Sequence, residues 1–370
     1  DLKVWDWFET ALDENVSNLK KEHCFISAKL GAMEAIKSGT TTILDFNYPH
    51  PTGFLVDECF DAFSSVGIRS IVARAIIDQG KAHPKIINES EKEINDCIRL
   101  LEKYHQNDND MQHVWLAPYT IFSTSLQTYK RIVKLANEFD TSVTIHASTP
   151  STIEESKALY GMKDIEFQYS QNLLANNVLA AHCTTDIDKS VLDILKKCDV
   201  KISHNPASNC YLGEGIAPIA EMLDHGLTVG LGTDGPASNN NHDMIFIIKL
   251  TALLQKVKYL NPEAISAETV LRLATIEGAK CVGLEKIIGS LEIGKKADIS
   301  IFDLSSLNTV TMHDPIKSIV YSSNQNNVSD VIINGKFILK RREFLEQNEN
   351  DIIATAQSLG EDLVKNLDVS

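Results

Sequence analysis

Short apolar runs rich in β-branched residues alternate along the chain with longer segments whose apolar residues recur at helical spacing. The short runs predict strands at residues 41–45, 68–74, 113–117, 142–146, 178–182, 200–203 and 227–232. The longer segments predict helices at residues 21–37, 88–105, 125–139, 152–160, 187–197 and 214–225. Continuous apolar runs separated by helices are typical of parallel strands buried on both faces. We therefore expect an α/β fold with a parallel sheet.

Polar side chains stand at or just past the ends of several predicted strands. His146, His182, His204 and Asp234 each follow a different apolar run. A doubly wound sheet would also fit the alternation, but strand ends that carry polar residues favour a barrel, where they converge on one face. Seven predicted strands are one fewer than a (β/α)8 TIM-type barrel contains. A barrel with seven of its eight strands would have two open edges, which is energetically costly. Either the first strand lies upstream of residue 1 or the fold departs from a complete barrel.

The alternation stops near residue 289. Apolar runs at residues 299–302, 316–321 and 331–339 follow, and the last contains Asn334-Gly335, a strong hairpin signal. We therefore predict a barrel over residues 1–288, a small β domain over residues 289–349 and a C-terminal helix within residues 350–370.

Composition narrows the class of protein. The 370 residues are 43% hydrophobic and carry a net charge of −15, and no long Lys/Arg cluster interrupts them. Binding to nucleic acid or to an anionic membrane is therefore not expected. No apolar run reaches the roughly 18 residues of a membrane span. The seven scattered cysteines form no Cys-x-x-Cys pair and predict reduced thiols in a cytoplasmic protein.

Five strand-associated motifs occur in an order that is similar to the amidohydrolase superfamily. They are Ser38-Gly39-Thr40-Thr41-Thr42, Ile145-His146, Ala181-His182-Cys183, residues 203–209 (Ser-His-Asn-Pro-Ala-Ser-Asn) and residues 232–240 (Gly-Thr-Asp-Gly-Pro-Ala-Ser-Asn-Asn). Residues 274–280 and 288–298 continue the likeness, which covers essentially the whole chain. Each motif is weak by itself, but the ordered set most resembles methylthioadenosine/S-adenosylhomocysteine deaminases and the related triazine chlorohydrolases.

This resemblance implies one divalent metal ion, zinc or alternatively ferrous iron, which makes hydroxide available near neutral pH. His146 and Asp234 match metal ligands, and Asp234 also matches the carboxylate that takes a proton from the bound water. His182 matches the histidine that hydrogen-bonds the attacking water. Residues 114–117 contain no lysine, so a mononuclear site is expected.

The sequence departs from these families at two catalytic positions. Their first strand ends in His-x-His, which supplies two metal ligands, and this chain contains no His-x-His. The predicted missing strand and the missing ligands are thus one absence, expected just upstream of residue 1. The deaminases also carry a glutamate three residues after the histidine matched by His146. Thr149 stands at that position, and Glu154 and Glu155 lie too far along the chain to be assigned its role.

Four further residues are candidate substrate contacts. His204 and Asn205, with Asn209 nearby, either contact substrate or brace their loop. Tyr119 occupies the position where the deaminases carry a histidine. Arg74 is either a substrate contact or a barrel-layer or helix-pairing residue. No arginine matches those that hold the substrate carboxylate in the deaminases.

The leading hypothesis is a metal-dependent hydrolytic deaminase, an amidohydrolase acting on a C–N bond. Its small-molecule substrate would be an aminated heteroaromatic ring, such as a methylthioadenosine- or S-adenosylhomocysteine-type nucleoside. One alternative is hydrolytic dechlorination or deamination of a triazine-like ring. Another is a non-catalytic paralogue, which the absent His-x-His and glutamate would explain. The resemblance also allows a homo-oligomer, which nothing in the sequence derives.

Overall fold

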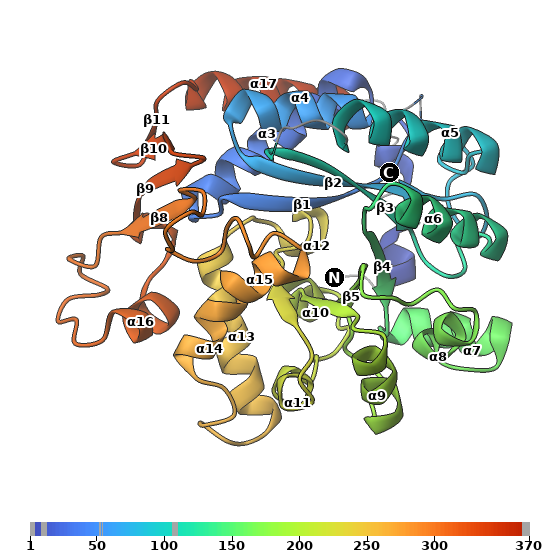
Figure 1. Cartoon of the computed structure of the whole chain (residues 1–370). Helices are drawn as coiled ribbons and strands as arrows, with labels where there is room; N and C mark the ends of the chain where they lie inside the picture. Colours follow the sequence, from blue (N-terminus) through green and yellow to red (C-terminus); the bar gives the residue numbers. More distant parts are fainter. Residues whose placement is uncertain (1–3, 9–12, 52, 54, 106–109, 365–370) are drawn as a thin grey trace. The chain divides into compact units, whose positions relative to one another are not determined.

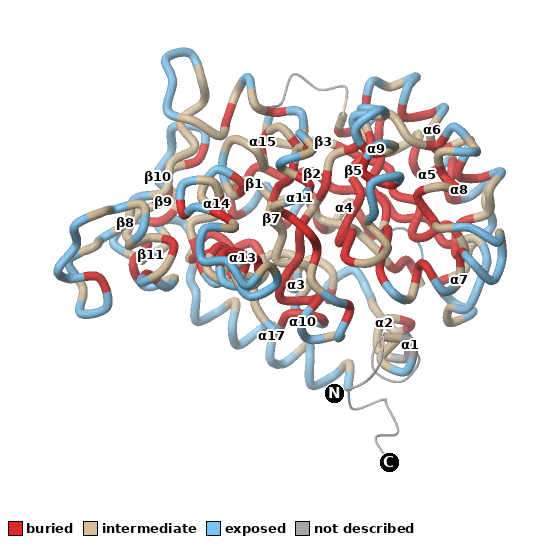
Figure 2. The backbone as a smooth tube through the Cα atoms, turned by 90° about the horizontal axis from the view of Figure 1, so that it is seen from below, coloured by how far each residue is buried: buried red, intermediate tan, exposed pale blue. Residues whose placement is uncertain are grey.

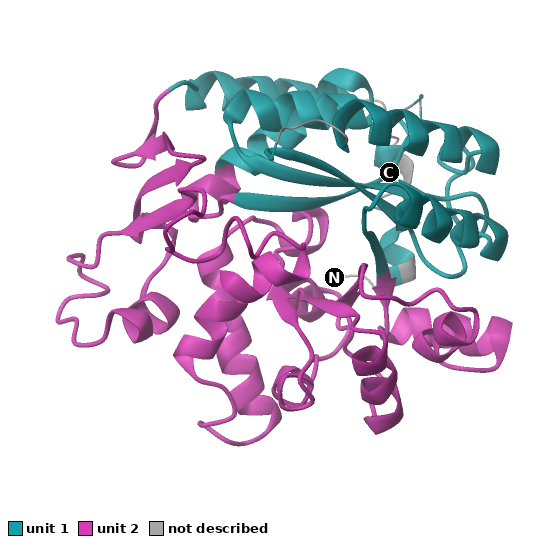
Figure 3. Cartoon of the chain, viewed as in Figure 1, with its two compact units in different colours: residues 1–33, 42–145, 346–370 teal, residues 34–41, 146–345 magenta. Residues whose placement is uncertain are grey.

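The computed structural model describes residues 4–8, 13–51, 53, 55–105 and 110–364 of the chain. The chain divides into two compact units (Figure 3). Unit 1 comprises residues 1–33, 42–145 and 346–370, and unit 2 comprises residues 34–41 and 146–345. Each unit is described in turn.

Unit 1 contains the first parallel strands and the helices that cover them (Figure 1). Its strands are β1 (Thr42–Asn47), β2 (Arg69–Ile76), β3 (Gln112–Pro118) and the start of β4 (Val143–Ala147). Its helices are α1 (Val4–Trp7), α2 (Asp13–Val16), α3 (Lys21–Lys37), α4 (Val56–Val66), α5 (Ser90–Leu100), the π-helix η2 (Leu101–His105), α6 (Leu126–Glu138) and α17 (Glu349–Val364). Helices α4 and α5 pack on β2, and α6 packs on β3. Every residue of β2 is buried, whereas α17 is largely exposed (Figure 2).

Unit 2 continues the parallel strands with β5 (Val178–His182), β6 (Lys201–His204) and β7 (Val229–Leu231). Its helices between and after these strands are α7 (Pro150–Tyr160), α8 (Asp164–Ser170), α9 (Lys189–Lys197), α10 (Pro206–Tyr211), α11 (Ile219–Asp224), α12 (Pro236–Asn239), α13 (Met244–Lys258), α14 (Ala267–Leu273) and α15 (Ile276–Cys281). Short helices α16 (Pro315–Lys317), η3 (Ser318–Ser322) and η4 (Gln325–Asn327) follow. The unit also holds an antiparallel sheet of β8 (Ile299–Phe302), β9 (Val328–Ile333), β10 (Lys336–Lys340) and β11 (Glu343–Phe344).

All seven predicted parallel strands are present, close to their predicted bounds. They hydrogen-bond in the order β1-β2-β3-β4-β5-β6-β7, which is also their order along the chain. A doubly wound sheet would reverse direction at a switch point, so the strand order supports the predicted barrel topology. The predicted hairpin at Asn334-Gly335 joins β9 to β10, which confirms the small β region.

Two sequence predictions were wrong. Residues 316–321 are helical, because Asp314 accepts a hydrogen bond from the Lys317 amide at 3.1 Å and Pro315 occupies the first helical position. The helix predicted at residues 214–225 begins only at Ile219. Gly213 and Gly215 have φ of 68° and 91°, values that favour a turn over a helix.

The structure also contains helices outside the predicted ranges, among them α4, α8 and α13. The predicted boundaries at residues 288 and 349 do not coincide with the two compact units and stay predictions. Among the described residues, no helix combines the length and apolar character that crossing a bilayer requires.

Candidate active site

Strands β4 and β5 bring two of the predicted histidines together in unit 2. The rings of His146 and His182 lie nearly parallel, with centroids 5.5 Å apart and planes inclined by 17°. His146 is partly exposed and His182 is buried. The backbone leaves β5 through left-handed conformations at His182 and Cys183, with φ of 74° and 49°. Non-glycine residues adopt such conformations at a cost, and they concentrate at functional sites.

Asn209 fixes the orientation of His182. His182 Nδ1 donates a hydrogen bond to Asn209 Oδ1 at 2.8 Å, and Asn209 is itself 2% exposed. Helix α10 presents this asparagine, and Pro206 at its first position sets the start of the helix. Because Nδ1 is occupied, Nε2 is the ring nitrogen of His182 that remains for a reacting group.

Asp234 follows β7 and adopts a left-handed conformation with φ of 58°. Its Oδ1 accepts a hydrogen bond from the Gly235 amide at 2.8 Å. Burial acts to raise the pKa of Asp234, but His182, Ser208 and His146 outweigh it, so the pKa lies below its ordinary value. Asp234 is therefore a carboxylate at neutral pH, which suits both metal binding and proton abstraction.

His204 ends β6 and is fully buried. Within the described residues, neither of its ring nitrogens has a hydrogen-bond partner. Burial and the proximity of His182 lower the pKa of His204 to about 3. The ring is thus neutral at physiological pH and offers one donor and one acceptor, so substrate contact stays a sound prediction for this residue.

Asn205 has the character of a loop-bracing residue. Its Oδ1 accepts a hydrogen bond from the Ser203 hydroxyl at 3.0 Å. The same oxygen lies only 2.3 Å from the place where a Cβ at residue 232 would stand. Gly232 is therefore required for this close approach. Of the two interpretations of Asn205, these contacts favour bracing.

A carboxyl group that the sequence did not single out also belongs to this cluster. Glu214 lies in the loop between α10 and α11 and is 7% exposed. Its carboxyl lies near the side chains of Thr149 and Ser151, and its pKa responds to these residues and to His182. The sequence carries no local signal for this role, because Glu214 falls in a segment with helical spacing that is far from Thr149 along the chain.

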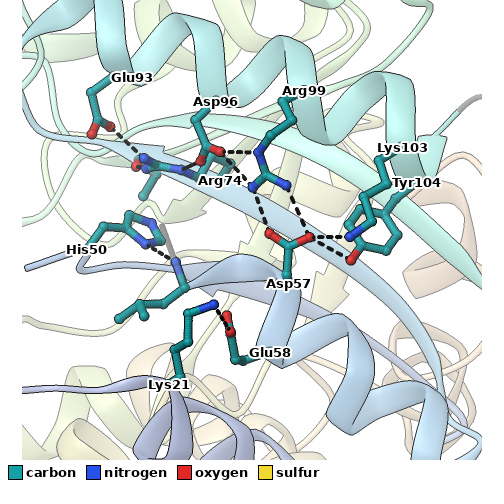
Figure 4. A network of polar contacts seen from close by, with 12 residues as sticks. Lys21, His50, Asp57, Glu58, Arg74, Glu93, Asp96, Arg99, Lys103 and Tyr104 are labelled. Carbon is teal, nitrogen blue, oxygen red and sulfur yellow. Dashed lines mark hydrogen bonds and ion pairs between the residues drawn. The ribbon is translucent and has the colours of Figure 1, made fainter. Parts of the chain in front are cut away.

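Arg74 lies in unit 1, within a buried ion-pair network (Figure 4). Its guanidinium contacts Glu93 Oε2 at 3.0 Å and Asp96 Oδ2 at 2.9 Å, and its side chain is fully buried. Both carboxylates belong to α5. The structure thus favours the helix-pairing interpretation of Arg74, because a buried guanidinium committed to two carboxylates does not suit substrate binding.

Tyr119 also lies in unit 1, directly after β3. Its ring belongs to an aromatic cluster, with centroids 4.6 Å from Tyr48, 6.0 Å from Phe46 and 6.1 Å from Phe8. Its role as a substrate contact stays a prediction.

The donors of unit 2 suit a divalent metal in kind. His146 and Asp234 offer imidazole and carboxylate ligands, which zinc prefers, and the lowered pKa keeps Asp234 ionised. Among the described residues, however, no group of three or more His, Cys, Asp or Glu side chains is arranged to hold a metal ion. Metal binding by His146 and Asp234 therefore stays a prediction.

Comparison with known proteins shows the family to which this chain belongs. The profile described as Amidohydrolase family matches residues 2–338. A 5'-deoxyadenosine deaminase of Methanobrevibacter smithii is 36% identical over 365 residues, which cover 98% of this chain and 81% of that protein. A 5-methylthioadenosine/S-adenosylhomocysteine deaminase of Thermococcus onnurineus is 35% identical, with 93% of this chain and 78% of that protein covered.

Solved structures agree with this likeness and with the barrel fold. An adenosine deaminase from Xanthomonas campestris with bound zinc has a TM-score of 0.92 and 26% identity, with 99% of this chain and 81% of that chain covered. The atrazine chlorohydrolase from Arthrobacter aurescens complexed with zinc has a TM-score of 0.92 and 25% identity, covering 97% and 82%. With a family profile across most of its length and relatives above 30% identity, this chain belongs to the amidohydrolase family.

Proposed function

We propose that the protein is a metal-dependent hydrolytic deaminase that replaces the amino group of a purine nucleoside by oxygen. The observation that carries this proposal is the grouping of His146, His182 and Asp234 at the ends of β4, β5 and β7 in unit 2. The relatives named for 5'-deoxyadenosine and for 5-methylthioadenosine/S-adenosylhomocysteine support a nucleoside whose 5' position is modified.

Each residue has a chemical role in this proposal. Asp234, ionised at neutral pH, takes a proton from the attacking water. His182, oriented by Asn209, hydrogen-bonds through Nε2 to the oxygen that adds to the ring carbon and stabilises the charge that develops there. His204, neutral and without a partner among the described side chains, is available to a ring nitrogen or a hydroxyl of the substrate.

The proposed cofactor is one divalent ion, with zinc as the first choice because two structurally similar proteins hold zinc. His146 and Asp234 would hold it together with further donors. When bound, the ion lowers the pKa of a water molecule toward about 7 and so supplies hydroxide at neutral pH.

Ammonia release tests the proposal. The zinc-loaded full-length protein would be offered 5'-deoxyadenosine, 5'-methylthioadenosine, S-adenosylhomocysteine and cytosine, and ammonia would be measured with time. We expect release from the adenine nucleosides and not from cytosine. Absence of ammonia from every substrate would overturn the deaminase proposal and favour a non-catalytic paralogue.

A second candidate is displacement of chloride from a triazine ring. Thr149 favours it, because a hydroxyl cannot deliver protons as a carboxyl does, and chloride leaves without a proton. The structural likeness to an atrazine chlorohydrolase points the same way. Chloride release from a chlorotriazine, without ammonia release from any nucleoside, would support this candidate over the deaminase.

A further inference from the structure

The loop between α10 and α11 holds Glu214 rigidly within unit 2. The Glu214 amide donates to the Asn209 carbonyl at 2.8 Å, and its own carbonyl accepts from the Thr184 hydroxyl at 2.5 Å. Asn209 is also the partner of His182. One short segment, α10 and the loop after it, therefore positions both the imidazole of His182 and the backbone of Glu214.

The carboxyl of Glu214 faces the turn that follows β4. It lies near the hydroxyls of Thr149 and Ser151, whose oxygens are 2.8 Å from each other. Burial raises the pKa of Glu214, while Thr149, His182 and Ser151 lower it, and burial prevails. A carboxyl with a raised pKa, next to hydroxyls that accept or donate, is suited to both give and take a proton.

Asp164, a second buried carboxyl near the same turn, has a different character. It accepts hydrogen bonds from the Ser148 amide at 2.6 Å, the Ser148 hydroxyl at 3.0 Å, the Thr152 hydroxyl at 3.0 Å and the Ile165 amide at 2.8 Å. Its oxygens are thus committed to holding the turn. The pKa values of Asp234 and Glu214, in contrast, both respond to His182.

Hydrolytic deamination requires two proton carriers. Water adds its oxygen to the ring carbon while a proton reaches the neighbouring ring nitrogen. The C–N bond to the amino group then breaks, and that group leaves as ammonia after gaining a proton. Asp234 serves as the carrier that activates water, but it cannot protonate the ring nitrogen while it accepts the proton of the water. A protonated carboxyl must supply this second proton.

We propose that Glu214 is this second proton carrier, an inference that rests on the deaminase function proposed above. As Asp234 takes a proton from water and the C–O bond forms, Glu214 gives its proton to the ring nitrogen. Asp234 then protonates the amino group, Glu214 regains a proton from the new hydroxyl, and ammonia departs as the C=O bond forms. Both carboxyl groups end in their starting states, and no oxidant or reductant is consumed.

The position of Glu214 compensates for the departure at Thr149. The related deaminases carry a glutamate at the position of Thr149, and here a glutamate from a distant loop lies beside the Thr149 side chain. A carboxyl group therefore lies at the same turn, although it comes from a different part of the sequence.

Replacing Glu214 by glutamine tests the proposal, because the amide keeps the size and polar character of the side chain but carries no titratable proton. In the zinc-loaded full-length enzyme, E214Q should lower kcat for nucleoside deamination by about 10²- to 10⁴-fold, with KM, zinc content and melting temperature close to wild type. The matched control is E154Q, because Glu154 is exposed on the neighbouring α7 and should leave kcat unchanged.

A rescue variant separates chemistry from structure. The double variant T149E/E214Q returns a carboxyl to the turn after β4. Its kcat should be at least about tenfold higher than that of E214Q, which is part of the contribution expected of general acid–base catalysis. Near-wild-type kcat in E214Q would overturn the proposal. A loss that T149E does not restore, or that accompanies lost zinc or a lower melting temperature, would assign Glu214 a structural role and overturn it as well. If the wild type deaminates no nucleoside, it is the proposed function itself that fails.

Discussion

Several site residues hold backbone conformations that are costly for residues other than glycine. Ser148, His182, Cys183 and Asp234 have φ between 49° and 74°. Each such residue costs on the order of 1–3 kcal/mol and persists only where surrounding contacts enforce it. The Cys183 amide, for example, donates to the Ala147 carbonyl at 3.0 Å. These backbone conformations lower the stability of the fold, and they set the directions of the side chains.

The hydrogen bond between His182 and Asn209 leads to a prediction at the residue scale. Asn209→Ala removes the acceptor that fixes the ring, so kcat should fall roughly ten- to hundredfold, as for other residues that orient a catalytic histidine. Asn209→Asp keeps an acceptor at the same position and should retain more activity than the alanine variant. Steady-state kinetics with matched zinc content checks both. Equal activity of N209A and wild type would contradict the orienting role.

The sequence singled out the candidate site residues that stand at the ends of apolar strands, since a strand end is visible in one local pattern. His146, His182 and Asp234 belong to that class. Glu214 could not be found in the same way, because its partner Thr149 is distant in sequence and the contact depends on the course of a loop. Arg74 was ambiguous in the sequence, and only the packing of α5 against β2 revealed its ion-pair partners.

At the scale of elements, the parallel strands were predictable because burial on both faces leaves an uninterrupted apolar run. The errors arose where local chemistry outweighed that pattern. The apolar run at residues 316–321 resembles a strand, yet Asp314 and Pro315 begin a helix there. The segment at residues 214–225 has helical spacing, yet two glycines with positive φ delay the helix until Ile219.

A cluster around Asp57 joins α4 to α5 and η2 in unit 1 (Figure 4). Asp57 accepts hydrogen bonds from Arg99 at 2.7 and 3.1 Å, from Lys103 at 2.7 Å and from Tyr104 at 2.8 Å. Burial acts to raise the pKa of Asp57, but these three partners outweigh it and hold the pKa well below its ordinary value. The ionised carboxylate therefore favours the folded state.

The Asp57 cluster predicts a pH-dependent change in stability. Asp57→Asn should lower the free energy of unfolding at pH 7 by about 1–2 kcal/mol, allowing for solvent screening of partly exposed partners. Because the folded pKa lies below the unfolded value of about 3.9, this contribution is present above about pH 4 and is lost as the pH falls through the folded pKa. Urea unfolding of D57N and wild type at several pH values measures it.

Glu58→Gln on the same helix is the matched control for D57N. Glu58 pairs at 2.8 Å with Lys21, whose side chain is 72% exposed, so its loss should cost less than about 1 kcal/mol. A stability difference between D57N and wild type that stayed constant down to pH 2 would contradict the assignment to the ionised carboxylate.

At the scale of the whole molecule, the chain follows a barrel order of strands and carries its candidate catalytic residues on the later strands. Unit 2 contributes His146, His182, His204 and Asp234, and it contributes Glu214 from a loop. The order of strands and the motifs were enough to predict this family. The absence of His-x-His was also visible in the sequence, whereas the position of Glu214 depends on the course of a loop and was not.

Zinc binding by variants of the full-length protein should distinguish the metal ligands from the residues that act on water. His146→Ala removes a proposed ligand and should weaken zinc binding by more than about a hundredfold. The exposed His313 provides the control variant H313A, which should bind zinc as the wild type does. Zinc content after dialysis, measured by atomic emission, checks this. Unchanged zinc content in H146A would show that His146 is not a ligand.

The most direct test of the account is the rate of ammonia release from 5'-deoxyadenosine by the zinc-loaded full-length protein and its His182→Gln variant. His225→Gln is the control, because His225 pairs with Asp193 at the surface of unit 2. We predict that wild type and H225Q release ammonia at similar rates. H182Q should keep its zinc and lose roughly 10²- to 10⁴-fold in rate. A wild type that releases no ammonia, or an H182Q variant as active as the wild type, would contradict the account.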